Sequence, residues 1–166
     1  MKFRHLPVVT VFLLIWLVPY KASADQRRNL FGLQGVHLIT NNLENDIIHD
    51  GLTMNSLRTD IELRMLKAGV KTLNSSSWMM TPGKPFLSVN IFTLKIDSYH
   101  YIYNIRVELV EEARLTRRPE LQDITSITWE GERLGITTID TIQKISDSLG
   151  DLIDEFISDY TVVNPK

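Results

Sequence analysis

The strongest pattern along the chain is an alternation of apolar and polar residues between positions 86 and 115. From Tyr99 to Leu109, large apolar side chains recur at every second position, and polar or charged side chains fall mainly between them. A period of two puts each set on its own face of an extended chain, so it predicts a strand with one buried and one solvated side. We predict a hairpin here, with strands at 86–96 and 99–115.

The first strand of this hairpin changes phase. Its apolar side chains occupy odd positions up to Ile91 and even positions from Phe92 to Ile96. A regular strand with one buried face keeps its apolar residues in a single phase. The change therefore predicts either a β-bulge near Ile91 and Phe92 or a strand that is covered on both faces over part of its length.

An amphipathic helix is predicted over residues 54–68. Its apolar side chains recur at three- and four-residue spacing, and most of its charged side chains lie outside that stripe. Thr53 is in place to cap the N-terminus through its hydroxyl oxygen. Gly69 follows the last turn and can adopt the left-handed conformation that ends a helix.

A second and longer helix is predicted at the C-terminus. An apolar stripe runs at helical spacing from Ile139 to Tyr160, and Thr137 with Asp140 fits a capping box at its start. Burial of each large apolar side chain of the stripe would contribute about 1.5–3 kcal/mol. This helix is therefore predicted to cover the sheet.

Three shorter strands complete the predicted fold. Residues 36–40, 70–73 and 124–130 are rich in β-branched or aromatic side chains, and the glycines within 131–135 predict a turn after the last of them. The element order β-α-β-β-β-β-α predicts an α+β fold. It would have a mainly antiparallel sheet of about five strands and two amphipathic helices on one face.

The first 24 residues predict a secretory signal peptide. Lys2 and Arg4 precede an apolar run at residues 8–18, and Ala22-Ser23-Ala24 has the small-x-small pattern of a cleavage site. An uncleaved membrane anchor is the alternative, but a spanning helix needs about 20 apolar residues and this run is shorter. We expect a periplasmic or secreted protein, with cleavage near Ala24.

The mature chain would then divide simply. Residues 25–34 are predicted to be a flexible lead-in with Phe31 as its bulky anchor, residues 35–163 a single domain, and residues 164–166 a tail. Cleavage would leave 15 of the 18 basic residues against 20 acidic ones, a formal charge of −5 that argues against a nucleic-acid partner. The chain has no cysteine, so no disulfide supports the fold, which suits a bacterial envelope.

Two segments carry a resemblance to known proteins. The succession Leu-Arg-Thr-Asp-Ile-Glu followed by Leu-Lys-Ala-Gly-Val, within Gly51 to Val70, and the ending Leu-Ile-Asp-Glu-Phe-Ile-Ser-Asp-Tyr before Asn164 resemble exported bacterial proteins of unassigned function. In layout the chain is similar to small envelope domains such as the N-terminal domain of the translocation protein TolB and the curli-secretion protein CsgG. The resemblance implies an α+β envelope module and no functional residue.

Two groups of polar residues are weak candidates for sites. Asp46, His49 and Asp50 are a possible metal-ligand set, although the same residues suit a polar loop that leads into a helix. The second group, Arg114, Arg117 and Arg118, could bind phosphate or anionic lipid headgroups at a membrane surface. Glutamates flank the arginines, which favours a solvated loop.

Catalytic motifs are absent from the sequence. His37 and His100 each fall in a predicted strand and could pair with a carboxylate, but a half-exposed strand histidine is the commoner situation. The chain has no Gly-x-Ser-x-Gly elbow and no phosphate- or dinucleotide-binding glycine pattern. We therefore expect no enzymatic activity and no cofactor.

The predicted loop at residues 74–85 contains three large apolar side chains: Trp78, Met79 and Met80. Such side chains on a loop suit an adaptable contact surface, although they could also fold back to close the end of the core. We expect a non-enzymatic interaction or assembly module that binds an envelope partner through this loop or through a sheet edge. The alternatives are a carrier of a small apolar ligand, held against the tyrosine-rich face, and a metal-assisted hydrolase around His49.

Overall fold

The structure, a computed structural model, describes residues 23–121 and 124–165. Four strands form one mixed sheet in the order β1 (His37–Thr40), β2 (Phe86–Lys95), β3 (His100–Ala113) and β4 (Ile124–Thr138). Strand β1 runs parallel to β2, and the other neighbours are antiparallel. The predicted α+β class is confirmed, and the sheet has four strands where about five were predicted.

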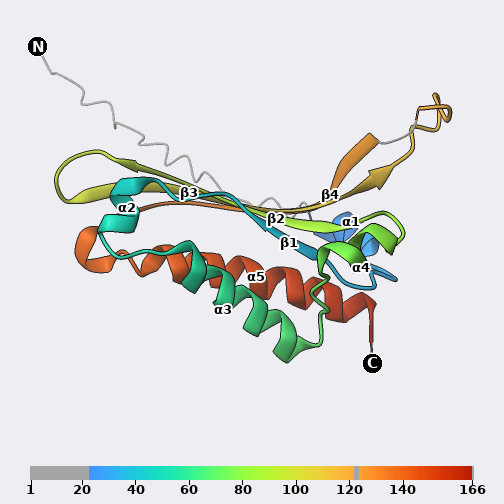
Figure 1. Cartoon of the computed structure of the whole chain (residues 1–166), viewed down its shortest axis with the longest axis horizontal. Helices are drawn as coiled ribbons and strands as arrows, with labels where there is room; N and C mark the ends of the chain where they lie inside the picture. Colours follow the sequence, from blue (N-terminus) through green and yellow to red (C-terminus); the bar gives the residue numbers. More distant parts are fainter. Residues whose placement is uncertain (1–22, 122–123, 166) are drawn as a thin grey trace, which may run out of the picture.

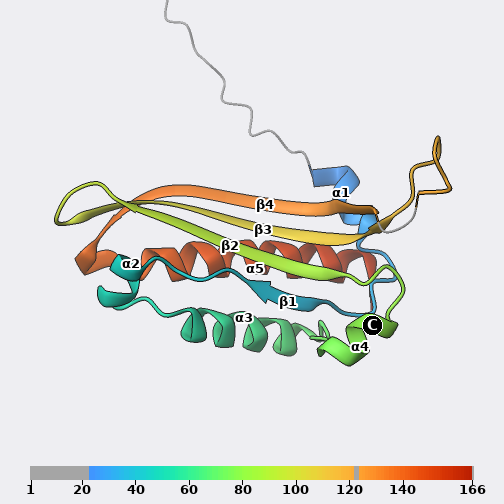
Figure 2. The ribbon, with the colours of Figure 1, turned by 45° about the horizontal axis from the view of Figure 1, so that its top comes forward.

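The helices are α1 (Ser23–Asn29), α2 (Asn45–His49), α3 (Met54–Ala68), α4 (Ser75–Met80) and α5 (Lys144–Val163), with a short 3-10 turn at Ile139–Thr141. Helices α3 and α5 lie side by side under one face of the sheet, and no long helix among the described residues covers the other face (Figures 1 and 2). The caps of α3 are as predicted: Thr53 accepts a hydrogen bond from the Ser56 N–H, and Gly69 has a φ of 80°.

The core fills the space between the sheet and these two helices. Side chains at odd positions of β2 and β3 meet the buried stripes of α3 and α5, and Trp129 of β4 packs edge-on against Phe156 of α5 with ring centroids 5.1 Å apart. The sheet contributes Leu87, Val89, Ile91, Tyr101, Tyr103, Ile105, Val107 and Leu109, and the helices contribute Leu57, Ile61, Met65, Ile145, Leu149, Leu152, Ile153 and Phe156. The tyrosine face of the predicted hairpin is therefore core.

The predicted turn at 131–135 is wrong, because these residues lie inside β4. Both glycines serve close packing instead of chain reversal. A Cβ atom at Gly135 would lie 2.4 Å from the phenol oxygen of Tyr103, and one at Gly131 would lie 2.9 Å from a methyl carbon of Leu152. Only glycine leaves room for these neighbours, so β4 continues to Thr138 as a 15-residue edge strand.

Two smaller predictions near these elements are also wrong. Residues 70–73 form no strand and make a single parallel bridge, between Val36 and Thr72. The capping box before α5 joins Thr138 to Thr141, not Thr137 to Asp140. The shift follows from the longer β4, since Thr137 still belongs to the strand and its side chain is buried.

The segment predicted to be a flexible lead-in forms α1 and docks on the domain. Leu30 and Leu33 are buried, whereas Phe31, the expected anchor, is exposed. Asn164 of the predicted tail donates to the Leu30 carbonyl and accepts from the Gly32 N–H at 2.8 Å each. Both ends of the described chain are thus fixed to each other.

Candidate functional site

The outer face of the sheet, opposite the helices, carries an apolar patch at the end near the β2–β3 turn. Register places Phe92, Asn104 and Leu134 in one cross-strand row, and Leu94, Ile102 and Ile136 in the next. Phe92, Leu94, Leu134 and Ile136 are between 59% and 75% exposed. We call this the outer patch, formed by Phe92, Leu94, Ile96, Ile102, Leu134 and Ile136. Contiguous exposed apolar side chains, unlike scattered ones, mark interaction sites.

The outer patch explains the change of phase in β2. Strand β2 pairs with β3 from Phe86 to Lys95 without a register shift, and the irregularity in the sheet lies instead between Leu109 and Val110. Both predicted explanations, a bulge at Ile91 and Phe92 or a strand covered on both faces, are therefore wrong. The apolar side chains at even positions point to an uncovered face.

A polar band bounds the outer patch toward the middle of the sheet. It consists of Arg106, Glu108, Glu130 and Glu132, one positive and three negative side chains on the outer face. Arg106 donates to Glu132 at 3.2 Å and Asn104 donates to the same oxygen at 2.8 Å. These two hydrogen bonds, that from Asn104 first, lower the pKa of Glu132 below its ordinary value. The band therefore carries a net negative charge beside an apolar surface.

The outer patch reaches an open edge of the sheet. Strand β4 is the last strand in the sheet order, and successive residues of an edge strand point their backbone groups alternately inward and outward. The Ile139 N–H donates to the backbone carbonyl of Tyr99, which directly precedes β3, so it points toward the sheet. The Glu130 N–H donates to the side chain of Gln26, which lies outside the sheet. From Thr128 to Thr138, on this side of the register shift, even-numbered residues of β4 therefore direct their N–H and C=O groups outward.

Between Thr128 and Thr138, the edge is covered at both ends and open in the middle. Helix α1 covers one end, where Asn29 donates to the Thr128 carbonyl at 2.8 Å and Gln26 accepts from Glu130. At the other end the Thr138 N–H bonds to the Thr141 hydroxyl. Between these two covers, the outward groups belong to Glu132, Leu134 and Ile136. We call these three residues the open edge.

Amide hydrogen exchange is expected to show this alternation. The amides of Arg133, Gly135 and Thr137 bond to β3 and should exchange more slowly than those of the open edge, by on the order of tenfold or more. Residue-resolved exchange measured by NMR checks the pattern. Equal protection along residues 132–137 would contradict it and would mean that something already pairs with β4.

A charged cluster lies where the loop before α3 meets the end of β2. The Asp50 carboxylate accepts from Lys95 Nζ at 2.7 Å and from the Tyr101 hydroxyl at 2.6 Å, and the Lys95 ammonium lies 5.1 Å from the Tyr101 ring centre. These hydrogen bonds, that from Lys95 first, lower the pKa of Asp50 from 3.8 to about 2. The cluster fastens the loop to the sheet.

The lowered pKa of Asp50 predicts a pH-dependent stability. Because the folded-state pKa lies below the unfolded one, the Asp50 carboxylate stabilises the fold above about pH 4, and this contribution disappears as the pH falls from about 4 to about 2. Urea unfolding of wild type and Asp50→Asn should therefore show a clear difference in stability at pH 6 that shrinks toward pH 2. A difference that stays constant over this range would contradict the assignment.

The predicted metal ligands do not converge. His49 Nδ1 lies 3.3 Å from Asp50 Oδ1, but the imidazole is almost fully exposed and Asp46 points to solvent. Across residues 23–121 and 124–165, no three His, Asp or Glu side chains are grouped as a metal ion would require. Asp50 is engaged by Lys95 instead.

The two strand histidines have local partners. His37 Nδ1 lies 2.8 Å from the Leu73 carbonyl oxygen, and His100 Nδ1 lies 2.9 Å from Asp97 in the β2–β3 turn. Neither histidine faces a carboxylate across the sheet. Both hydrogen bonds therefore hold local structure in place.

The predicted loop with Trp78 contains helix α4, which Asn74 caps by accepting from the Ser77 N–H. Trp78 is half-buried, stacks on His37 with centroids 5.3 Å apart and donates from Nε1 to the Lys84 carbonyl at 2.7 Å. Met79 and Met80 are 56% and 85% exposed. The structure thus separates the three side chains: Trp78 packs on the end of β1, and the methionines remain on the surface.

The predicted anion-binding arginines lie on the exposed segment between β3 and β4. Arg114, Arg117 and Arg118 are all exposed, and Arg118 forms an ion pair with Glu120. Their role in anion binding stays a prediction.

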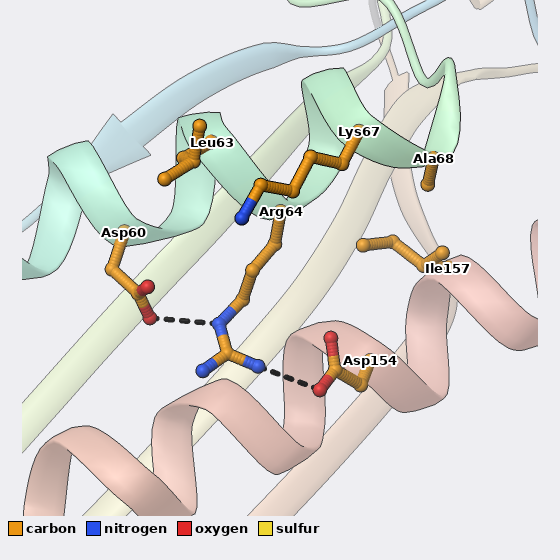
Figure 3. Close-up of a pocket in the computed structure, with 7 residues that line it drawn as sticks. All are labelled: Asp60, Leu63, Arg64, Lys67, Ala68, Asp154 and Ile157. Atoms are coloured by element: carbon orange, nitrogen blue, oxygen red, sulfur yellow. Dashed lines mark hydrogen bonds and ion pairs between the residues drawn. The ribbon is translucent and has the colours of Figure 1, made fainter.

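A hollow of about 500 Å³ lies between α3 and α5 (Figure 3). Arg64 crosses it and donates to Asp60 at 2.8 Å and to Asp154 of α5 at 2.6 Å. The guanidinium lies over Gly150, where a Cβ atom would come within 2.7 Å of it. Arg64 engages both carboxylates and so joins α3 to α5. We therefore interpret the hollow as a surface groove beside a structural contact between the two helices.

The predicted signal peptide falls largely on residues 1–22, outside the described residues. Within the described ranges, no helix combines the length and apolarity needed to cross a membrane. No protein-family model, curated protein or solved structure matches the chain. The outer patch and the open edge are therefore the features of the molecule that bear on its function.

Proposed function

We propose that this protein is a non-enzymatic interaction module of the bacterial envelope, which binds an extended segment of a partner protein along β4. The observation that carries the proposal is the coincidence of the open edge with the outer patch. Leu134 and Ile136 belong to both, so a strand added at the edge would gain backbone hydrogen bonds and apolar contacts at once. This is the physics of β-strand addition.

The state of the edge also supports the proposal. Proteins usually protect edge strands with charges, prolines or covering segments, because an open edge invites pairing with other chains. Here α1 covers β4 at Glu130 and Thr141 covers it at Thr138, whereas the stretch between them keeps two exposed apolar side chains. A short open stretch with a cover on each side is consistent with a specific pairing site.

The other predicted contact surface receives less support. Trp78 is held by His37 and Lys84, so it contributes to packing on β1. The alternative of a small apolar ligand requires space at the tyrosine face. That face is filled: Tyr103 touches the backbone of Gly135 and exchanges a hydrogen bond with Ser148 of α5. We keep Met79 and Met80 as a secondary contact.

Site-specific photo-crosslinking in the native host tests the proposal. A photoreactive amino acid at Leu134 should capture a partner through a defined extended segment, whereas the same group at Leu66 of α3, which is equally exposed, should not. Mass spectrometry of the crosslink locates the segment. The purified partner should then slow amide exchange at the open edge.

Two outcomes would contradict the proposal. One is crosslinking of equal efficiency and identity from Leu134 and Leu66. The other is capture of a protein that leaves the exchange of Glu132, Leu134 and Ile136 unchanged when it is added back. Loss of binding in Met79→Ala with Met80→Ala, with the β4 edge unaffected, would transfer the site to α4.

A further inference from the structure

We infer that the segment bound at β4 is an antiparallel strand of the pattern apolar-x-apolar-x-basic. This inference rests on the proposed function and specifies the partner of the same site. Its apolar positions would lie opposite Ile136 and Leu134, and its basic position opposite Glu132. The inference follows from the order of side chains on the outer face of β4, where an acidic residue is followed by two apolar ones.

The alternation of the strand sets the pattern. Side chains at Glu132, Leu134 and Ile136 share the outer face, so every second residue of an added strand would stand beside them on that face. An antiparallel strand meets Ile136 first and Glu132 last. The residues between them would face the side of α5, beside Gly135 and Arg133. We choose the antiparallel direction because that pairing is slightly more stable per residue.

The excess negative charge of the polar band favours a basic residue in the bound segment. Its only basic side chain, Arg106, is already engaged with Glu132 at 3.2 Å and lies 3.9 Å from Glu108. Arg133 of β4 faces the helices, where it donates to Glu155 at 2.9 Å. The polar band thus keeps an excess of two negative charges, and Glu130 is exposed beside Glu132. A long basic side chain opposite Glu132 would also reach Glu130 diagonally.

The covered ends limit the length of the segment. Gln26 occupies the outward N–H of Glu130, and Thr141 occupies that of Thr138. The edge between them spans residues 131–137, which is enough for the five-residue pattern with one flanking residue on each side. A longer strand would have to displace α1.

A second copy of this chain and a membrane surface both fit the site less well than a basic peptide segment does. Antiparallel pairing of β4 with a second copy centred on Leu134 would place Ile136 opposite Glu132, an apolar side chain against a charge. Pairing centred on Gly135 would place Ile136 opposite Leu134, but it would need the Thr138 N–H, which Thr141 already occupies. The negative polar band would be repelled by anionic lipid. Both occupants are therefore outcomes of the test.

NMR titration of the purified protein with three soluble peptides provides the test. Each carries one core sequence: Val-Thr-Leu-Thr-Lys, its acidic counterpart Val-Thr-Leu-Thr-Glu, or the reversed order Lys-Thr-Leu-Thr-Val. We expect the first to shift the amides of the open edge and to bind about tenfold more tightly than the acidic peptide at low salt. The difference should shrink in 0.5 M NaCl. The reversed peptide should bind less tightly.

Matched variants separate the charge from the edge. Glu130→Lys should abolish the preference for the basic peptide, whereas Glu44→Lys, an equal change of charge at an exposed site before α2, should leave it intact. Leu134→Pro removes an outward N–H without touching the β3 ladder and should abolish binding of all three peptides. Circular dichroism confirms that each variant is folded.

The outcomes are distinguishable. Equal binding of the basic and acidic peptides would overturn this inference and leave the proposed function standing. If no peptide shifts the open edge and the crosslinked partner does not protect it, both fail. A dimer in sedimentation that Leu134→Pro dissociates would assign the edge to a second copy. Binding to phosphatidylglycerol vesicles in place of the peptides would assign it to a membrane.

Discussion

Replacing Asp159 by alanine is expected to lower the free energy of unfolding by about 2–4 kcal/mol. Asp159 is the one buried acidic residue among the described positions. Its carboxylate accepts from the indole N–H of Trp129 at 3.0 Å and forms an ion pair with Arg27 of α1 at 2.6 Å. Alanine would leave the indole donor buried without a partner and would release Arg27. Both losses destabilise the fold.

Asp159→Asn is the control for this variant. Asparagine keeps an oxygen for the Trp129 indole and loses only the charge that attracts Arg27, so its cost should be about half as large. Urea unfolding followed by far-UV circular dichroism measures both variants. Stability of Asp159→Ala within about 0.5 kcal/mol of wild type would show that neither contact contributes.

Asp159 also links the core to the candidate site. Through Arg27 it holds α1, and α1 covers one end of β4 through Asn29 and Gln26. In both variants the Glu130 amide should therefore exchange faster than in wild type. Faster exchange at Glu130 with no change at Arg133 would show that α1 detaches while β4 stays paired with β3.

Local patterns in the sequence predicted the elements that depend on nearby residues. Helix α3 has the predicted limits because its start and end depend on Thr53 and Gly69, which adjoin it. The hairpin of β2 and β3 follows from its period of two and the polar turn at Asp97. The errors fall where tertiary packing decides. Gly131 and Gly135 indicate a turn locally, but in the fold they make room for Leu152 and Tyr103.

The candidate site was visible in the sequence only in part. The change of phase at Phe92 arises because the side chains at even positions from Phe92 onward belong to the outer patch. To interpret it, one must know which face of the sheet the helices cover. The spacing of residues along one strand does not contain that information. Leu134 and Ile136 were missed because they lie in or beside the predicted turn, whereas β4 carries them opposite Asn104 and Ile102. The open edge requires the strand order, which no local pattern contains.

Gly135→Ala is expected to destabilise the protein by about 1–3 kcal/mol, the usual range for overpacking a filled core. Alanine suits a strand better than glycine does, so propensity alone would predict a gain in stability. Here the added Cβ would lie 2.4 Å from the Tyr103 ring, which is buried and whose hydroxyl is bonded to Ser148 at 2.9 Å. The ring would have to move away from α5.

The neighbouring Leu134→Ala is the matched control. Leu134 is 75% exposed, so its truncation should change stability by less than about 0.5 kcal/mol. Gly135→Ala combined with Tyr103→Phe should recover part of the loss, because the phenylalanine ring lacks the oxygen that the methyl group meets. Thermal unfolding of the three variants measures this. A Gly135→Ala protein as stable as wild type would mean that the Tyr103 ring moves freely, and the glycine would then owe its place in β4 to something other than this contact.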